Sequence, residues 1–76
     1  MAIYRDVNGD SGVESYETGD DWILVTFSKG QQRHYTYTYE VTGAENVEHM
    51  KQLAASGDGL NSFINKHVKR LYSHKE

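Results

Sequence analysis

The hydrophobic pattern of this chain changes its period once, close to Thr42, and this change limits the folds open to it. Before that point apolar and polar side chains tend to alternate, as in "RHYTYTYEV" at 33–41, where tyrosines occupy alternate positions. Successive side chains of a β-strand point to opposite faces, so such alternation is typical of strands. After Thr42 the apolar residues recur at the spacing of an amphipathic helix. The sequence therefore predicts an α+β domain with its strands first and its helices second.

Three segments of the first half have the length and composition of strands. They are residues 13–16, the dense apolar run "WILVTF" at 22–27, and residues 33–41. Turn-forming residues separate them, with "TGDD" at 18–21 and "SKGQ" at 28–31, where Gly30 suits a hairpin. We expect a three-stranded antiparallel β-meander.

Two helices are expected after the strands. Thr42 and Glu45 have the spacing of a capping box, in which both side chains accept hydrogen bonds from backbone N–H groups at a helix start. The apolar stripe of the first helix consists of Val47, Met50, Leu53 and Ala54. Gly57 predicts its end, because glycine adopts the left-handed conformation common at helix termini, and Asp58 can cap a second helix. The stripe of that second helix consists of Leu60, Phe63, Ile64, His67, Val68 and Leu71.

The expected order of elements is therefore β-β-β-α-α, and each helix needs an apolar sheet face to cover. On the strand at 22–27 both faces are largely apolar, whereas on the strand at 33–41 one face carries tyrosines and the other threonines. A sheet covered on one face usually directs its larger apolar groups inward, which favours two helices packed on the tyrosine face. The alternative is an exposed tyrosine row that contacts a ligand.

The size and composition of the chain narrow the class of protein. At 76 residues it forms a single domain, which we expect to span 11–76 after a flexible N-terminal arm at 1–10. The chain has no cysteine, so neither a disulfide nor a thiolate zinc site is expected. No apolar run approaches the ~20 residues that span a bilayer, so we expect a soluble cytoplasmic protein without a membrane partner.

Charge is distributed unevenly along the chain, although the formal net charge is only −3. Acidic residues dominate 1–28, and basic residues dominate 59–76. On the expected second helix Lys66, Lys69 and Arg70 have the i, i+3, i+4 spacing that places side chains on one face. This face is either an ordinary solvated surface or a surface that binds phosphates.

Motifs for catalysis or metal binding are weak. Residues 6–17, "DVNGDSGVESYE", match part of the ligand spacing of an EF-hand calcium loop, but Ser11 stands where the loop needs glycine and the flanking helices are missing. No two of the four histidines have the spacing of a helical metal pair. Neither a nucleophile motif nor a glycine-rich phosphate loop occurs. We expect a non-enzyme without catalytic residues, cofactor or metal.

Two functions remain open from these residues. The first is a small nucleic-acid-binding module, because single-stranded RNA or DNA is bound by aromatic side chains that stack on bases beside cations that contact phosphates. Its candidate residues are Tyr35, Tyr37, Tyr39, Lys66, Lys69 and Arg70. The second is a protein-interaction or accessory module, whose sheet face or edge pairs with another chain or with a second copy of itself.

The order of several short motifs resembles the KTSC domain, a bacterial module that occurs alone and at the C-terminus of some lysyl-tRNA synthetases. These motifs are "SGVESYETGDDWILVTFSKG" at 11–30, "YTY" at 35–37 and "GLNSFINKHVKRLY" at 59–72. The resemblance implies a β-meander with helices, no established activity and a suggested link to RNA. It also implies a set of characteristic residues with an expected structural role, namely Tyr35, Tyr37, Phe63 and Asn65. The chain departs from the family by adding Tyr39 and by lacking a proline after Val41.

Overall fold

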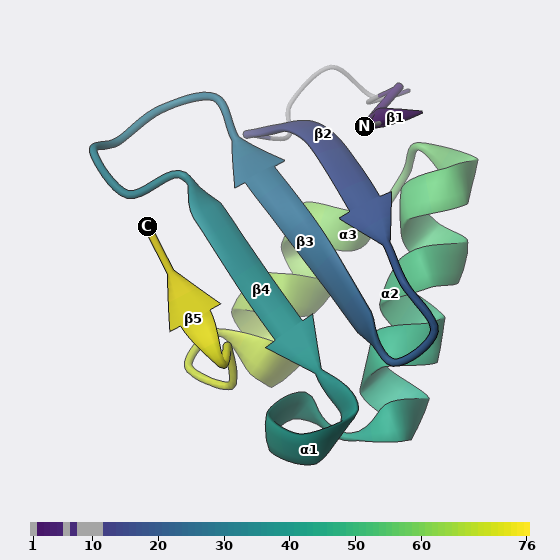
Figure 1. Ribbon diagram of the computed structural model, residues 1–76. Coiled ribbons are helices and arrows are strands. Elements are labelled where there is room, and N and C mark those ends of the chain that lie inside the picture. The colour runs from purple at the N-terminus through teal and green to yellow at the C-terminus, as the bar shows by residue number, and fades with distance from the viewer. Residues whose placement is uncertain (1, 6, 8–11) are drawn as a thin grey trace.

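Strands occupy the first half of the chain and helices most of the second, in agreement with the change of period (Figure 1). The computed structural model describes residues 2–5, 7 and 12–76. The strands are β1 (Ala2–Ile3), β2 (Val13–Thr18), β3 (Trp22–Phe27), β4 (His34–Thr38) and β5 (His74–Lys75). The helices are α1 (Tyr39–Thr42), α2 (Ala44–Ser56), α3 (Leu60–Phe63) and the π-helix η1 (Ile64–Val68).

The five strands of the described chain form one antiparallel sheet in the order β1-β2-β3-β4-β5. Strands β2, β3 and β4 are the meander that the sequence predicts. The expected number of three strands is wrong, because the two-residue strands β1 and β5 add one edge strand on each side. A two-residue strand cannot show an alternation, so neither of these pairings leaves a sequence pattern.

Residues 2–5 lie against the domain, although the sequence pattern places 1–10 in a flexible arm. The Tyr4 ring is buried, and its hydroxyl accepts a hydrogen bond from the backbone N–H of Leu60 over 3.3 Å. This contact joins the start of the described chain to the start of α3. The rest of 1–10, apart from Val7, lies outside the described residues.

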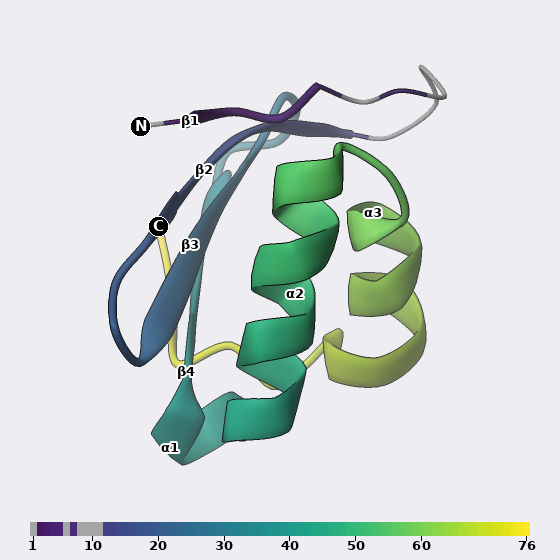
Figure 2. The ribbon, with the colours of Figure 1, turned by 90° about the vertical axis from the view of Figure 1, so that its right-hand side faces the viewer.

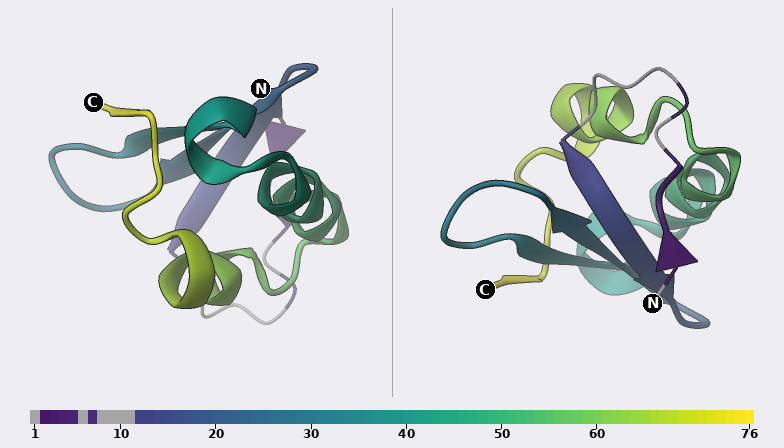
Figure 3. Two further views of the ribbon diagram at one scale, coloured as in Figure 1. Left: turned by 90° about the horizontal axis from the view of Figure 1, so that it is seen from below. Right: turned by 90° about the horizontal axis from the view of Figure 1, so that it is seen from above.

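The helices cover one face of the sheet, as the side view in Figure 2 shows. Figure 3 shows the same two layers along two further directions. Across β3 and β4, Ile23 pairs with Tyr37 and Val25 pairs with Tyr35, so these four side chains share one face. That face belongs to the core that α2, α3 and η1 complete. The expected packing of the helices on the tyrosine face is thus confirmed.

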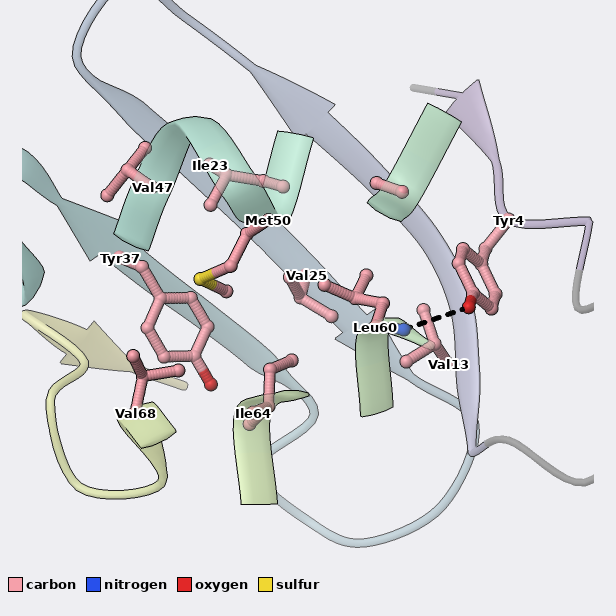
Figure 4. Close-up of a cluster of buried hydrophobic side chains, with 11 residues drawn as sticks. Tyr4, Val13, Ile23, Val25, Tyr37, Val47, Met50, Leu60, Ile64 and Val68 are labelled. Carbon is pink, nitrogen blue, oxygen red and sulfur yellow. Dashed lines mark hydrogen bonds between the residues drawn. The ribbon is translucent and has the colours of Figure 1, made fainter. Parts of the chain in front are cut away.

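A cluster of fully buried side chains joins the two layers (Figure 4). Its largest members are Tyr37, Ile23, Met50, Leu60, Val25, Val47 and Val68. Burial of one such side chain is worth about 1.5–3 kcal/mol, so this cluster is what holds the helices on the sheet. Among the tyrosines at 35–39 only Tyr37 belongs to the cluster, whereas Tyr35 and Tyr39 pack against it and stay half-buried.

The alternation of tyrosines continues one position beyond the strand. Strand β4 ends at Thr38, whereas the predicted strand reaches residue 41, and Tyr39 begins α1. The Thr38 hydroxyl accepts a hydrogen bond from the backbone N–H of Val41 over 3.3 Å, which caps α1. Tyr39 therefore belongs to α1 and lies outside the paired strand, although its ring packs against the same core.

The predicted capping box is wrong. Thr42 is the last residue of α1, and its hydroxyl donates a hydrogen bond to the carbonyl of Leu71 over 2.5 Å. Gly43, with a φ of 100°, separates α1 from α2, and no side chain caps α2 there. The Thr42 hydroxyl thus joins α1 to the segment after η1 instead of starting a helix. The predicted end of α2 is confirmed, since Gly57 adopts the left-handed conformation.

The second helical segment departs from a continuous α-helix. Its first turn, α3, passes into the π-helix η1, and its buried positions are Leu60, Ile64 and Val68. A π-helix pairs residue i with i+5 and has a wider turn than an α-helix, so an α-helical stripe does not stay in register with the core. Phe63 is half-buried, and His67 and Leu71 are exposed. The predicted cap at Asp58 is also wrong, because Gly59 precedes the helix.

A chain of polar contacts joins α1 and α2 to the β2–β3 turn. The Tyr39 hydroxyl donates a hydrogen bond to the Glu48 carboxylate over 2.5 Å, and the Lys51 ammonium lies 2.8 Å from the same oxygen. Lys51 also donates to the backbone carbonyls of Gly19, over 2.7 Å, and Asp20, over 3.1 Å. The hydrogen bonds from Lys51 and Tyr39 hold the pKa of Glu48 below its ordinary value.

Acid is expected to remove the stabilisation that the Glu48 charge provides. A carboxylate whose pKa is lowered by folding stabilises the folded state above its unfolded pKa and loses that effect as the pH falls. The stability difference between the wild-type protein and Glu48→Gln should therefore be largest near neutral pH and shrink as the pH falls below the ordinary value of 4.5. Urea unfolding at a series of pH values measures this difference. A difference that stays constant down to low pH would contradict the prediction, and Glu45→Gln on the same helix is the control.

Candidate functional site

A cavity of about 610 Å³ opens between the sheet and the end of η1. Its described lining comes from Gly12, the end of β3 and the β3–β4 loop, the inner face of β4, η1 with the residues that follow it, and β5. The C-terminal segment contributes because it runs from η1 to the edge of the sheet beside β4 (Figure 3). Segments far apart in the sequence thus form this site together.

One wall of the cavity is aromatic. The Tyr35 ring meets the rings of Phe27 and Tyr72 edge to face, with centroid distances of 5.3 and 5.2 Å. All three rings are half-buried, and they line the cavity together with Tyr37. Rings that are held by their neighbours and still partly open offer a firm apolar surface for a planar ligand.

Tyr37 lies at the inner end of this wall, where its ring also belongs to the core. Burial raises the pKa of its phenol, and the neighbouring hydroxyls of Tyr35 and Tyr72 raise it further. The phenol therefore stays protonated well above neutral pH. A protonated phenol at the cavity wall is able to donate a hydrogen bond to a ligand.

The other lining side chains include four cations, and no carboxylate of the described residues lines the cavity. Lys69 and Arg70 directly follow η1, Lys29 belongs to the β3–β4 loop, and Lys75 belongs to β5. Counting one charge for each of these four gives the lining a formal charge of +4, in a chain whose net charge is −3. The cavity is therefore a local region of positive charge on an acidic protein. Such a region attracts anions.

Lys75 reaches the cavity through the pairing of β5 with β4. It lies opposite Tyr35 in that pairing, and its ammonium is 5.2 Å from the centroid of the Tyr72 ring. A hydrogen bond with Tyr72 raises the pKa of Lys75. The cation and the aromatic wall are thus parts of one surface.

Asn65 is exposed on η1 and lines the cavity. Its side-chain amide makes no hydrogen bond with any residue in the described ranges. No hydrogen bond of this amide within those ranges supports the structural role expected for Asn65. An amide carries both donors and an acceptor, so at this position it is open to a ligand.

The structure brings together only part of the predicted nucleic-acid site. Tyr35, Tyr37, Lys69 and Arg70 all line the cavity. Lys66 is exposed on η1 but does not line the cavity, and Tyr39 lies on α1 with its hydroxyl bound to Glu48. Phe63 from the motif set stacks on His49 and contacts His67, at centroid distances of 4.7 and 4.9 Å, away from the lining.

Eight of the described lining residues were not among the sequence-based candidates, and those with a ring or a charge are Phe27, Lys29, Tyr72 and Lys75. Phe27 ends β3 and Lys29 lies in the β3–β4 loop, and no local pattern encodes that these residues line one cavity with the residues after η1. Lys75 enters through a strand of two residues. Tyr72 carries one signal, since it closes the motif at 59–72 that resembles the KTSC domain.

Neither the comparisons with known proteins nor the arrangement of possible metal ligands identifies a function for the chain. No protein-family model, curated protein or solved structure gives a significant match to the chain, so the resemblance to the KTSC domain stays a prediction. The described residues contain no cluster of three or more side chains able to hold a metal ion. The first part of the EF-hand-like segment at 6–17 lies mostly outside the described residues. Within those residues, no helix has the length and apolarity needed to cross a membrane.

Proposed function

We propose that this protein is a small, non-enzymatic module that binds single-stranded RNA at the cavity between β4 and η1. The observation that carries the proposal is the shared lining of one cavity by four aromatic rings and four cations. Single-stranded nucleic acids are bound by this combination, because bases stack on aromatic rings while cations contact the phosphates. The proposed KTSC-like character of the chain agrees with a role close to RNA.

The proposed arrangement assigns a part to each group of residues. A base packs against the half-open rings of Tyr35 and Tyr72, a contact worth about 1–3 kcal/mol for each base. Lys69 and Arg70 contact the adjoining phosphates. The Asn65 amide is free to pair with polar atoms on a base edge, or with the 2′-hydroxyl that distinguishes RNA from DNA.

Removing both cations that follow η1 is expected to weaken RNA binding at least tenfold. The variant Lys69→Ala/Arg70→Ala loses two charge-assisted contacts, and tenfold in affinity corresponds to about 1.4 kcal/mol. Fluorescence anisotropy with a short, labelled, mixed-sequence RNA at low salt measures the effect. The matched control is Lys66→Ala, which removes the same type of charge from η1 outside the cavity and should leave the affinity nearly unchanged.

Two results would count against this proposal. Absence of binding by the wild-type protein at low salt, where phosphate contacts are strongest, would exclude RNA binding. An equal loss in Lys66→Ala and in the cavity variant would show that the whole helix surface attracts RNA, and that the cavity is not the site.

The second candidate function is a protein-interaction or accessory module that associates with itself. One observation favours it: Ile3 on the edge strand β1 is 79% exposed. An edge strand presents unpaired backbone groups to a second chain, although a strand of two residues offers few of them. Sedimentation velocity on the wild-type protein and on Ile3→Lys tests this function. A monomer at all concentrations would exclude self-association.

A further inference from the structure

The cavity carries more positive charge than an internal piece of RNA would neutralise. Each internal nucleotide contributes one phosphate with a single negative charge. The cavity offers four cations around one space of about 610 Å³. A terminal phosphate monoester carries about −1.5 to −2 at neutral pH and has three strong acceptor oxygens. Together with the next phosphate of the strand, it approaches the charge that the cavity presents.

The shape of the site also favours an end of a strand. Proteins that bind along single strands use grooves that follow the backbone over about 4–16 nucleotides. A cavity of about 610 Å³ falls within the ~300–1,000 Å³ typical of small-molecule sites. Its inner end is closed by the buried side chains of Tyr37 and Ile64. One nucleotide fits such a site better than a continuous strand.

The cations of the cavity come from three separate segments of the chain. Lys29 comes from the β3–β4 loop, Lys69 and Arg70 from the end of η1, and Lys75 from β5. Three separate segments thus present charge to one space. This arrangement suits a compact group of high charge, since several cations are able to contact its oxygens at once.

We propose that the cavity binds the phosphorylated end of an RNA strand. The terminal phosphate lies among Lys29, Lys69, Arg70 and Lys75, and the first base packs against Tyr35 and Tyr72. This inference rests on the proposed binding of single-stranded RNA and adds the group that is recognised. The shared chemistry is a phosphate monoester on a nucleotide, at either the 5′ or the 3′ end of the strand.

Three RNAs of one sequence test the inference: one with a 5′-phosphate, one with a 3′-phosphate, and one with hydroxyl groups at both ends. We expect one of the phosphorylated RNAs to bind the wild-type protein at least tenfold more tightly than the hydroxyl RNA. The end that confers the advantage identifies the source of the monoester. Equal binding of all three RNAs would overturn the inference and leave RNA binding intact. Failure of all three to bind would instead exclude the proposed function.

A second experiment tests whether the terminal phosphate binds within the cavity. Lys29→Ala removes a cation from an exposed loop position, so the fold should be kept, as circular dichroism would verify. This variant should lose affinity for the phosphorylated RNA and change little toward the hydroxyl RNA. Lys66→Ala, outside the cavity, should keep the full advantage of the phosphate. If both variants reduce the advantage equally, the cavity does not hold the terminal phosphate.

Discussion

Replacing Leu60 with alanine (Leu60→Ala) is expected to lower the free energy of unfolding by about 2–5 kcal/mol. Leu60 is 0% exposed and lies in the core at the start of α3, and its backbone N–H is bound to the Tyr4 hydroxyl (Figure 4). Truncation leaves a cavity where the sheet, α2 and α3 meet. A domain of this size has a total stability near the low end of the usual ~5–15 kcal/mol, so the variant should be partly unfolded at room temperature or close to it.

Thermal and urea unfolding followed by circular dichroism measure this loss. For a domain of this size a loss of 2 kcal/mol lowers the Tm by about 8–16 °C. The matched control is Leu71→Ala, because Leu71 is 39% exposed and surface changes usually stay within about 0.5 kcal/mol. Similar melting of the two variants would show that α3 is not part of the core.

Thermal unfolding also tests whether Phe63 belongs to the core. Its position in the apolar stripe of the sequence predicts a core residue, whereas in the structure it is half-buried between His49 and His67. Although phenylalanine is the larger side chain, Phe63→Ala should therefore cost less than Leu60→Ala. A lower Tm for Leu60→Ala than for Phe63→Ala agrees with the observed α3 and η1. The reverse order would indicate that Phe63 is a core residue, as the α-helical stripe predicts.

The affinity for single-stranded RNA is expected to fall about 50-fold between 50 and 200 mM salt. Binding of single strands releases counterions, and the logarithm of the affinity falls with that of the salt concentration by about 0.7 for each phosphate contacted. If the four cavity cations neutralise about four negative charges, those of a terminal phosphate and of the phosphates that follow it, the slope is about −2.8. Anisotropy titrations at several salt concentrations give this slope directly.

Substitutions of the lining cations test whether the salt dependence of binding comes from the cavity. Lys69→Ala/Arg70→Ala removes two of the four contacts, so its slope should be about half that of the wild-type protein. Lys66→Ala should retain the wild-type slope, since Lys66 does not line the cavity. A wild-type affinity that does not change with salt would mean that phosphate contacts do not contribute to binding.

The sequence predicts the sheet well where a strand is long enough to show its period. Strands β3 and β4 follow from the run at 22–27 and from the alternation after Arg33, and the inner face follows from the size of the tyrosine rings. The alternation fails at Tyr39, because a helix begins there without any change in the local pattern. A period of two shows which residues share a face but not where the pairing stops.

The helical half is predicted less well, for a reason that lies in the backbone. Leu60, Ile64 and Val68 of the predicted stripe are buried, whereas His67 in η1 and Leu71 after it are exposed. Nothing in the sequence of η1 distinguishes the two helix types. Likewise, Thr42 has the side chain of a helix cap but binds the distant carbonyl of Leu71.

The sequence predicts only those parts of the candidate site that lie close together along the chain. Lys69 and Arg70 are neighbours at the end of the expected second helix, and Tyr35 and Tyr37 share a strand, so each pair is visible in a local pattern. The two pairs line one cavity only because segments far apart along the chain are in contact. The same holds for the further cations, which come from a loop and an edge strand. The most distant of these additions is Lys75, which pairs across β4 and β5.

Tyr37 belongs to the core and to the cavity wall at once. A substitution that reshapes the inner end of the cavity there also removes one of the largest buried side chains of the domain. Relatives of this protein that change their ligand would therefore vary at the mouth of the cavity, at positions such as Lys29 and Tyr72, and keep the inner end. The inner end of the cavity is thus tied to the stability of the fold, whereas exposed positions such as Lys29 are free to change the specificity.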